Sequence, residues 1–397
     1  MKVLLRNIIL SGGAPQSLLQ YVRVLESKNY SIKVLAQLSE PEIEKQYRIY
    51  SDELVEKDDF QSLFYKKKIK KLYCQLKNEY KELKNNKPDL VLALGEINGY
   101  FYGAFCESLG IPIIIFLAGG DLAWQSFRFK SLRCRDYICF SKENENLLRQ
   151  CRKDTDRIHV ISNRIMIKKQ FDDVPDHYLA KECDPVCILI TSRIVDGKFD
   201  SIHFFLKNLE EVASRVDFDI EVRIAGTGNR EEDLRLILDK ISKENINVSL
   251  LGHVDDLTEQ FEWAHIAVGK GRSVLEPIMM NRVGCVIGDN GELEVPNECN
   301  LDRLYHYNFA GRNLVCDNPV DLLYDLLQAI CNGCKTETIL NISEKIRQLY
   351  SAEFLPEKFM RVVKDVEIPS KPGKKINIPI LLFHFYYIHL KKKLLKN

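Results

Sequence analysis

The chain has 397 residues and a mass of 46.0 kDa, more than one hydrophobic core usually serves, so we expect two domains. Its 57 basic and 56 acidic residues leave a formal net charge of +1. This balance argues against a dedicated nucleic-acid-binding protein, because such proteins usually carry a large basic excess. The apolar start, residues 1–10, is interrupted by Arg6 and followed by Gly12 and Gly13, which predicts a first strand and not a secretory signal.

The cysteines indicate a reducing compartment. Twelve of them are scattered along the chain without a secretory signal, so we expect reduced thiols in a cytoplasmic protein. The one Cys-x-x-Cys pair, Cys331 and Cys334, has no second pair and no nearby histidine. No metal site is therefore expected.

Short apolar segments alternate with helical stretches in the first part of the chain. After a glycine turn at residues 11–15, Leu18, Leu19, Val22 and Leu25 recur at helical spacing. The predicted strands of this half are residues 2–10, 31–36, 89–94, 112–117 and 136–140, with a helix at 100–109 and a closing segment at 160–163. Such an alternation predicts a parallel sheet covered on both faces.

A second alternating set follows a polar, proline-containing linker at residues 172–185. Its predicted strands are residues 186–191, 220–225, 248–251, 266–268 and 283–287, with a helix at 231–242. The fold class is therefore α/β, with two doubly wound Rossmann-like halves facing a cleft. We expect ligands beyond the carboxyl ends of the strands.

The expected domains are an N-terminal Rossmann-like domain and a C-terminal Rossmann-like domain, followed by two short segments. Their ranges are residues 1–170, residues 171–350, a helix at 351–370 that packs back on the N-terminal domain, and a basic apolar tail at 371–397.

Two lysine-rich segments stand apart from this pattern. Residues 65–83 are expected to form an ordinary amphipathic helix with lysines at its start, and contact with an anionic membrane surface is the alternative. The tail from Lys371 holds seven lysines and no acid around an apolar, aromatic stretch at 376–390, which is too short to span ~30 Å of hydrocarbon. The tail is interpreted either as an interfacial anchor on an anionic membrane surface or as a C-terminal helix packed on the body of the protein.

An anion site is predicted after the apolar run 264–268. Gly269 and Gly271 let a backbone approach a ligand, and the helix that opens at Ser273 presents free N–H groups and the positive end of its dipole. Lys270 and Arg272 add positive charge, and Glu276 is suited to accept hydrogen bonds from sugar hydroxyls. A strand followed by a glycine turn and a helix predicts a binding site for a nucleoside diphosphate.

Two further loops follow strands of the same half. Arg193 and Lys198 lie on the loop after residues 186–191, and two cations there suit a diphosphate, with arginine able to bind two oxygens. Gly226 follows the next strand and allows close approach to a ligand, or a simple strand-to-helix turn. Gly12 and Gly13 hold the equivalent place in the first half, one glycine short of a dinucleotide fingerprint, so a dinucleotide cofactor is disfavoured.

These motifs, in this order, resemble the GT-B glycosyltransferases, closest to the large retaining family 4 (glycosyl transferases group 1). The motifs that carry the resemblance are residues 11–14, 118–121, 140–141, 161–163, 192–198, 225–228, 251–256 and 269–276.

The resemblance implies that the N-terminal domain is the acceptor-side domain and that the C-terminal domain binds the nucleotide sugar. It also implies roles for the predicted site. Arg193 and Lys198 would bind the donor diphosphate and stabilise the leaving nucleotide in place of a metal. Glu276 would hold the ribose, while Gly12 and Gly13 would line the cleft. The backbone N–H groups of Ser273 and Val274 would cap the diphosphate. No cofactor is expected, since the nucleotide sugar is a substrate.

Two positions depart from the family pattern. The family carries an acid eight residues before the equivalent of Glu276, where this chain has Val268, and a histidine where this chain has Ala118. Other residues that could reach the sugar are Glu96, Lys270, Asp289 and, as the leading candidate for a catalytic acid, Asp121, for which helix capping is the alternative.

The sequence thus predicts a retaining, nucleotide-sugar-dependent glycosyltransferase of polysaccharide or glycolipid synthesis. Its expected partners are a nucleotide-sugar donor and a saccharide or lipid-linked acceptor, and no nucleic acid. The missing acid and histidine keep open a catalytically silent nucleotide-sugar-binding subunit that supports a partner transferase. A GT-B-fold epimerase is a third interpretation, although it would need acid–base groups around the sugar.

Overall fold

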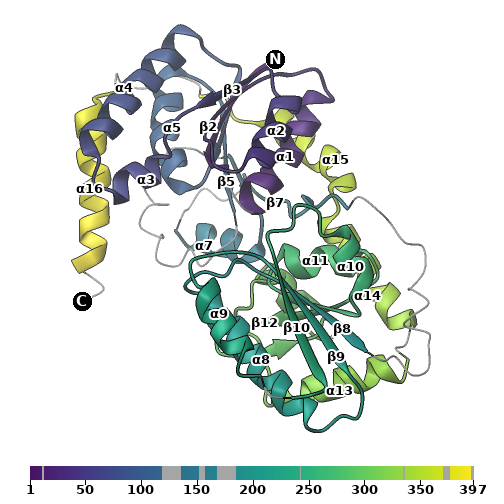
Figure 1. Ribbon diagram of the computed structural model, residues 1–397. Coiled ribbons are helices and arrows are strands. Elements are labelled where there is room, and N and C mark those ends of the chain that lie inside the picture. The colour runs from purple at the N-terminus through teal and green to yellow at the C-terminus, as the bar shows by residue number, and fades with distance from the viewer. Residues whose placement is uncertain are drawn as a thin grey trace. The chain divides into compact units, whose positions relative to one another are not determined.

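The computed structural model describes residues 1–10, 13–118, 136–151, 157–167, 185–241, 243–333, 336–369 and 376–394. The chain forms two compact units, each with its own sheet (Figure 1). The first unit comprises Met1–Arg164 together with Ala352–Asn397, and the second comprises Ile165–Ser351. The C-terminal segment from Ala352 therefore belongs to the same unit as the first strand.

The first unit is built on a parallel sheet. Within the described residues its strand order is β3-β2-β1-β4-β5-β6-β7. The strands are β1 (Lys2–Ile9), β2 (Ser31–Gln37), β3 (Glu53–Glu56), β4 (Leu90–Leu94), β5 (Ile113–Leu117), β6 (Asp136–Cys139) and β7 (Ile158–Val160). The chain proceeds from β1 toward β3 and then from β4 toward β7, so the connections that leave β1 and β4 run in opposite directions.

Helices cover both faces of this sheet, because successive side chains of a strand point to opposite faces. The face that includes Leu5 and Ile114 packs against α1 (Gly13–Glu26), α2 (Pro41–Tyr50) and α15 (Leu355–Asp365). The face that includes Leu4 and Ile115 packs against α3 (Phe60–Tyr65), α4 (Ile69–Asn85), α5 (Glu96–Leu109), α7 (Lys142–Cys151) and α16 (Ile378–Leu394). A 3-10 turn, η3 (Ala352–Phe354), precedes α15. The two C-terminal helices thus cover opposite faces of one sheet.

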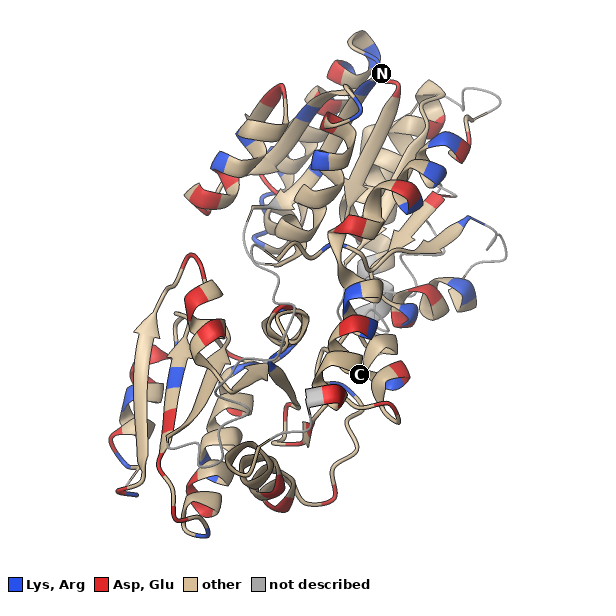
Figure 2. Cartoon of the chain, turned by 90° about the vertical axis from the view of Figure 1, so that its right-hand side faces the viewer, with Lys and Arg blue, Asp and Glu red and all other residues tan. Residues whose placement is uncertain are grey.

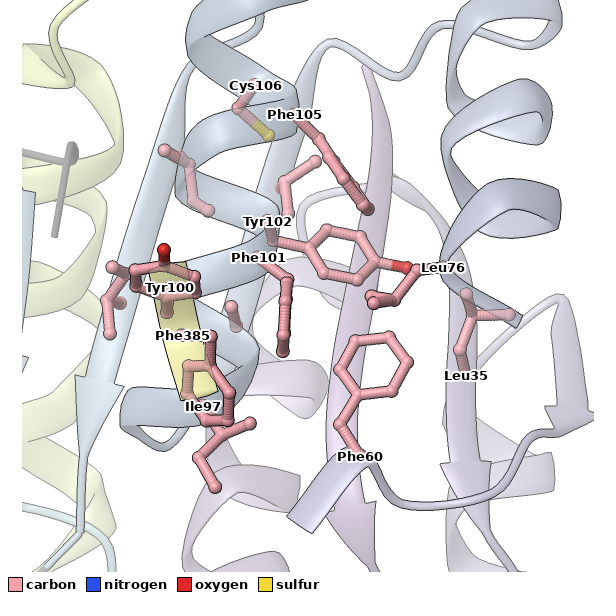
Figure 3. Packing of buried hydrophobic residues seen from close by; sticks show 14 of the residues in the cluster. Leu35, Phe60, Leu76, Ile97, Tyr100, Phe101, Tyr102, Phe105, Cys106 and Phe385 are labelled. Atoms are coloured by element: carbon pink, nitrogen blue, oxygen red, sulfur yellow. The ribbon is translucent and has the colours of Figure 1, made fainter. Parts of the chain in front are cut away.

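The C-terminal helix α16 packs on the first unit through an aromatic cluster. The ring of Phe385 lies 5.2 Å from that of Tyr100 and 5.0 Å from that of Phe101, centroid to centroid (Figure 3). The Tyr100 hydroxyl lies 2.8 Å from Nδ1 of His384, within hydrogen-bonding distance. The face of α16 that carries His384 and Phe385 is therefore packed on the first unit, as in the second of the two interpretations of the tail.

No helix in the described part of the chain has the length and apolar composition that a membrane span requires.

The second unit repeats the architecture. Within its described residues the order is β10-β9-β8-β11-β12-β13, parallel except for β13. The strands are β8 (Val186–Thr191), β9 (Ile220–Ala225), β10 (Ile246–Gly252), β11 (Ile266–Gly269), β12 (Val283–Ile287) and β13 (Leu293–Glu294). Helices α8 (Phe199–Ala213), α9 (Glu231–Leu238) and α13 (Pro319–Cys331) contribute to one hydrophobic cluster. Helices α10 (Thr258–Trp263), α11 (Arg272–Met279), α12 (Leu301–His306) and α14 (Thr336–Tyr350) contribute to two others.

The predicted fold class is confirmed, whereas some element limits are wrong. Helix α1 begins at Gly13, inside the predicted glycine turn, because Pro15 is tolerated in a first turn where the N–H has no intrahelical partner. The helix predicted from residue 65 begins at Ile69, since Lys67 adopts a positive φ of 55° that separates α3 from α4. The edge strand β3 went unpredicted because none of its four residues is buried.

Arg6, which interrupts the apolar pattern of β1, is fully buried and paired. Its Nε lies 3.2 Å from Oε2 of Glu79, its Nη2 donates to the carbonyl of Asp58 at 2.7 Å, and its guanidinium lies over the ring of Phe60. The Tyr102 hydroxyl donates to Oε2 of Glu79 at 2.5 Å, and burial raises the pKa of Tyr102 well above its ordinary value. The buried charge pair ties β1, α4 and α5 together.

We predict that Glu79→Leu strongly destabilises the first unit. The substitution leaves Arg6 charged and buried without its counterion, which typically costs about 3–5 kcal/mol. Amide hydrogen exchange of β1 and β4 measures this loss within the unit. The matched control is Glu53→Leu, which removes an acid 2.9 Å from Lys33 in a solvent-exposed pair, where a change of at most about 1 kcal/mol is expected. Equal exchange rates in the two variants would contradict the assignment.

Candidate nucleotide-binding site

The predicted phosphate loops flank one point in the sheet of the second unit. Strands β8 and β11 lie side by side, with Ile188 paired to Ile266 and Ile190 to Val268. The chain leaves β8 toward β9 and leaves β11 toward β12, so the connections diverge. In open α/β sheets, ligands bind in the crevice at such a switch point. The loop at residues 192–198 follows β8 and the link to α11 follows β11, so both lie at the carboxyl ends of these strands, where such a crevice is expected.

Glycines after β9 permit close contact between backbones. Gly226 has a φ of 150°, and a Cβ added there would lie 1.8 Å from the carbonyl oxygen of Ser192. A Cβ on Gly228 would lie 2.1 Å from the carbonyl oxygen of Ile194. The Ile194 N–H donates to the carbonyl of Thr227 at 3.0 Å. Gly226 and Gly228 therefore permit contact with the backbone before and after Arg193, which fixes the loop that carries this cation.

A link of two residues separates β11 from helix α11. Gly271 precedes the helix with a φ of 61°, which a residue with a side chain rarely adopts, and its N–H donates to the carbonyl of Phe309 at 2.6 Å. The Val274 N–H donates to the carbonyl of Gly271 at 3.1 Å, so that amide takes part in the first turn. A Cβ on Gly269 would lie 2.7 Å from Cβ of Ser273. The tight turn thus places the positive end of α11 directly at the crevice.

Three cations converge there. Burial lowers the pKa of Lys198, and the charges of Arg193 and Lys270 lower it further. Lys270 donates from Nζ to Oγ of Ser201 at 2.8 Å and forms an ion pair with Asp289. Within the described ranges, no carboxylate forms an ion pair with Arg193 or Lys198. The site therefore keeps uncompensated positive charge.

Glu276 lies in the second turn of α11 and is held by Arg272. Both Nε and Nη2 of Arg272 contact Oε1 of Glu276, at 2.6 and 2.5 Å, and both side chains are largely buried. This i,i+4 pair orients the carboxylate that the sequence assigns to a ribose. Ser201 was not predicted at the site, although its place three residues after Lys198, at the start of α8, is a signal that could have found it.

Val268 occupies the sheet and not the loop. It is fully buried in β11 beside Ile190, so counting eight residues back from Glu276 reaches the hydrophobic core. The link between β11 and α11 consists of Lys270 and Gly271. The position at the family spacing therefore lies in the strand, where this chain carries an apolar residue. In the part of the chain that the structure describes, no group of His, Cys, Asp and Glu is arranged to hold a metal ion.

Comparisons with solved structures agree with this architecture. The apo form of the lipopolysaccharide outer core galactosyltransferase WaaB matches with a TM-score of 0.61 at 14% identity, over 92% of this chain and 99% of the other. Anabaena Alr3699/HepE in complex with UDP-glucose matches with a TM-score of 0.62 at 13% identity, over 92% and 99%. The chain has the GT-B fold.

A third GT-B match is sucrose-phosphate synthase from Thermosynechococcus elongatus, with a TM-score of 0.62 at 11% identity over 91% of this chain and 98% of the other. No protein-family model and no curated protein matches the sequence. The similarity is therefore one of structure, and it establishes the fold.

The first unit holds the other predicted residues of this GT-B chain. Gly13 opens α1, and its carbonyl accepts a hydrogen bond from Oγ of Ser17 at 2.7 Å. Ala118 follows β5, and its carbonyl accepts from Nδ2 of Asn144 at 3.0 Å. Glu96 is the first residue of α5 and is buried. The predictions for Gly12 and Asp121 fall outside the described residues.

We predict that Gly226→Ala destabilises the second unit far more than a matched glycine substitution. A methyl group at 1.8 Å from the Ser192 carbonyl forces the two backbones apart. We expect a loss of roughly 3 kcal/mol or more, in the range of severe steric changes. Gly252→Ala is the control, because Gly252 also has a positive φ but open space around it, and strain alone costs about 1–2 kcal/mol. Similar melting temperatures for the two variants would contradict this packing.

We also predict that anion affinity falls at alkaline pH through Lys198. As the pH rises through its lowered pKa, Lys198 loses its proton before an ordinary lysine does, and the attraction for a diphosphate weakens. Calorimetric titration with inorganic pyrophosphate at several pH values measures the effect. In Lys198→Arg the guanidinium stays charged, so the decrease should be smaller. The same pH profile in both proteins would show that another group is responsible.

Proposed function

We propose that this chain is a glycosyltransferase whose nucleotide-sugar donor binds at the crevice between β8 and β11. The observation that carries the proposal is the convergence of Arg193, Lys198 and Lys270 beside the N-terminus of α11. Departure of a nucleoside diphosphate needs negative charge stabilised where it develops, and preorganised cations supply this. The arrangement suits a reaction in which side chains take the place of a metal.

The site would contact both the diphosphate and the ribose of the nucleotide. The diphosphate would contact the guanidinium of Arg193, the ammonium of Lys198 and the first amides of α11, including that of Ser273. Glu276, oriented by Arg272, would accept hydrogen bonds from the ribose hydroxyls. UDP is the first nucleotide to test, because HepE, a structure of similar fold, was obtained with UDP-glucose.

The sugar side of the site would depend on other groups. Asp289 and Lys270 form an exposed pair near the crevice and are the best-placed described residues to contact the transferred sugar. Asp121 remains the proposed catalytic acid. In the retaining mechanism that we propose, the leaving phosphate itself accepts the acceptor's proton, so the pair of carboxylates that glycosidases use is not required. The acceptor would be a saccharide or a lipid-linked sugar in polysaccharide or glycolipid synthesis.

The buried position of Val268 favours one second candidate, a catalytically silent subunit that binds nucleotide sugars for a partner transferase. Both functions predict donor binding. They differ in whether the isolated chain slowly hydrolyses the donor, with water as acceptor. Release of UDP from UDP-sugars by the purified chain would support the enzyme, and binding without release would support the silent subunit.

A cytoplasmic location is proposed from the thiols. Cys139 and Cys285 are buried free thiols whose pKa values are raised by burial, which suits a protein in a reducing compartment.

We predict that Arg193→Ala combined with Lys198→Ala abolishes UDP binding. Each lost charge-assisted hydrogen bond costs about 1.5–3 kcal/mol, so the double variant should bind at least about 100-fold more weakly. Isothermal titration calorimetry with UDP measures this. The control is Arg235→Ala, which removes an exposed arginine of α9 paired to Glu231 in the same unit and should leave affinity unchanged. Undiminished UDP binding by the double variant would refute the proposed donor site.

A further inference from the structure

Helix α16 is apolar on the side that it leaves to solvent as well as on the side that it buries. Ile378, Leu382 and Phe385 pack into the first unit. Phe383 and Tyr387 are 74% and 54% exposed, and Ile380 is 64% exposed. A helix that is hydrophobic all round usually has a second apolar environment, because its outer face gains nothing from contact with water.

The neighbouring helix α4 extends this apolar surface. α16 contacts the first turns of α4 (Figure 1). A groove of about 610 Å³ between them is lined by Ile69 and Tyr73 of α4 and by Pro379, Phe383 and Tyr386 of α16, among others. Ile69 is half exposed, as is Tyr65 at the end of α3. The two segments therefore present one aromatic and aliphatic surface, although they lie some 300 residues apart in the sequence.

Lysines border this surface. The exposed lysines at the junction of α3 and α4 are Lys66, Lys67, Lys68, Lys70 and Lys71. Residues 60–78 contain no acid, and the nearest carboxylate partner is that of Asp58, which pairs with Lys71 at 2.7 Å. The sequence of α16 also lacks acids and ends in Lys391, Lys392 and Lys393. Elsewhere acidic and basic positions are interspersed over both units (Figure 2), so this one-signed segment is a local feature of a nearly neutral chain.

We propose that α4 and α16 together dock the protein on the surface of an anionic lipid bilayer. Aromatic rings with a polar edge, such as that of Tyr387, suit the boundary between headgroups and acyl chains. Lysines around them are attracted to anionic headgroups, each worth about a fivefold change in affinity near the surface. With 17 residues and a rise of ~1.5 Å per residue, α16 is shorter than the ~30 Å hydrocarbon layer, so it lies on the bilayer and does not cross it.

The charge pattern favours an anionic bilayer over a second copy of the chain as the partner of this surface. A second copy of the same face would bring two groups of lysines together, which is unfavourable, whereas an anionic surface neutralises the exposed lysines of the α3–α4 junction. Docking is independent of the donor site, because α4 and α16 belong to the first unit and the β8–β11 crevice to the second. The two proposals can therefore fail separately.

The test is co-sedimentation of the full chain with vesicles. We expect binding to vesicles of phosphatidylcholine mixed with phosphatidylglycerol, weak binding to phosphatidylcholine alone, and a loss of binding at high salt, since the Debye length shortens. Phe383→Ser should weaken binding about 10-fold or more, because it removes a large buried apolar contact with the membrane. Lys66→Gln, Lys67→Gln and Lys68→Gln together should weaken it about 100-fold.

Matched controls separate docking from folding. Leu236→Ser alters a similarly exposed apolar residue on α9 of the second unit and should leave vesicle binding unchanged. Unchanged melting temperatures and UDP affinity would show that the α16 variants fold. Equal binding to neutral and anionic vesicles, absence of binding by the unaltered chain, or a lipid-free dimer that Phe383→Ser dissociates would each overturn the proposal.

Discussion

The parallel pairing of β8 with β11 is the constraint on which the candidate site depends. The two strands are buried on both faces, and their connections leave in opposite directions. At such a point a ligand-binding crevice is expected, here between the loop that carries Arg193 and the link that carries Lys270. Two glycines fix the backbone of these loops. Gly226, which follows β9, lets the first loop pack closely against it, and Gly271 turns the chain directly into α11.

Some basic side chains at this site are paired with carboxylates of the protein, and others are not. Asp289 compensates Lys270, and Glu276 compensates Arg272, whereas Arg193 and Lys198 have no carboxylate partner within the described residues. Burial and like charge both disfavour the ammonium of Lys198, as the direction of its pKa shift shows. A bound dianion would relieve this repulsion. Part of the binding free energy would therefore come from removing an electrostatic repulsion that is already present in the unliganded protein.

Apolar runs bounded by turns predicted most strands of both sheets, because strands buried on two faces have few alternatives. The loops that carry Arg193, Lys198 and Lys270 were predicted for the same reason, since each follows such a run. Other features depend on contacts distant in sequence. The Glu79 partner of Arg6 comes from α4, and Phe385 finds Tyr100 from the other end of the chain. The sequence already placed Val268 in a strand, whereas the pairing of Arg272 with Glu276 and of Lys270 with Ser201 and Asp289 came from the structure.

The link between β11 and α11 bears directly on the proposed mechanism. At the family spacing from Glu276 the chain has Val268, an apolar residue buried in β11. Gly269 and Gly271 keep α11 close to the strand, and Lys270 contacts Ser201 and Asp289. A transferase built this way would rely on the leaving phosphate for proton transfer, and Asp289 is the proposed contact to the sugar within the second unit.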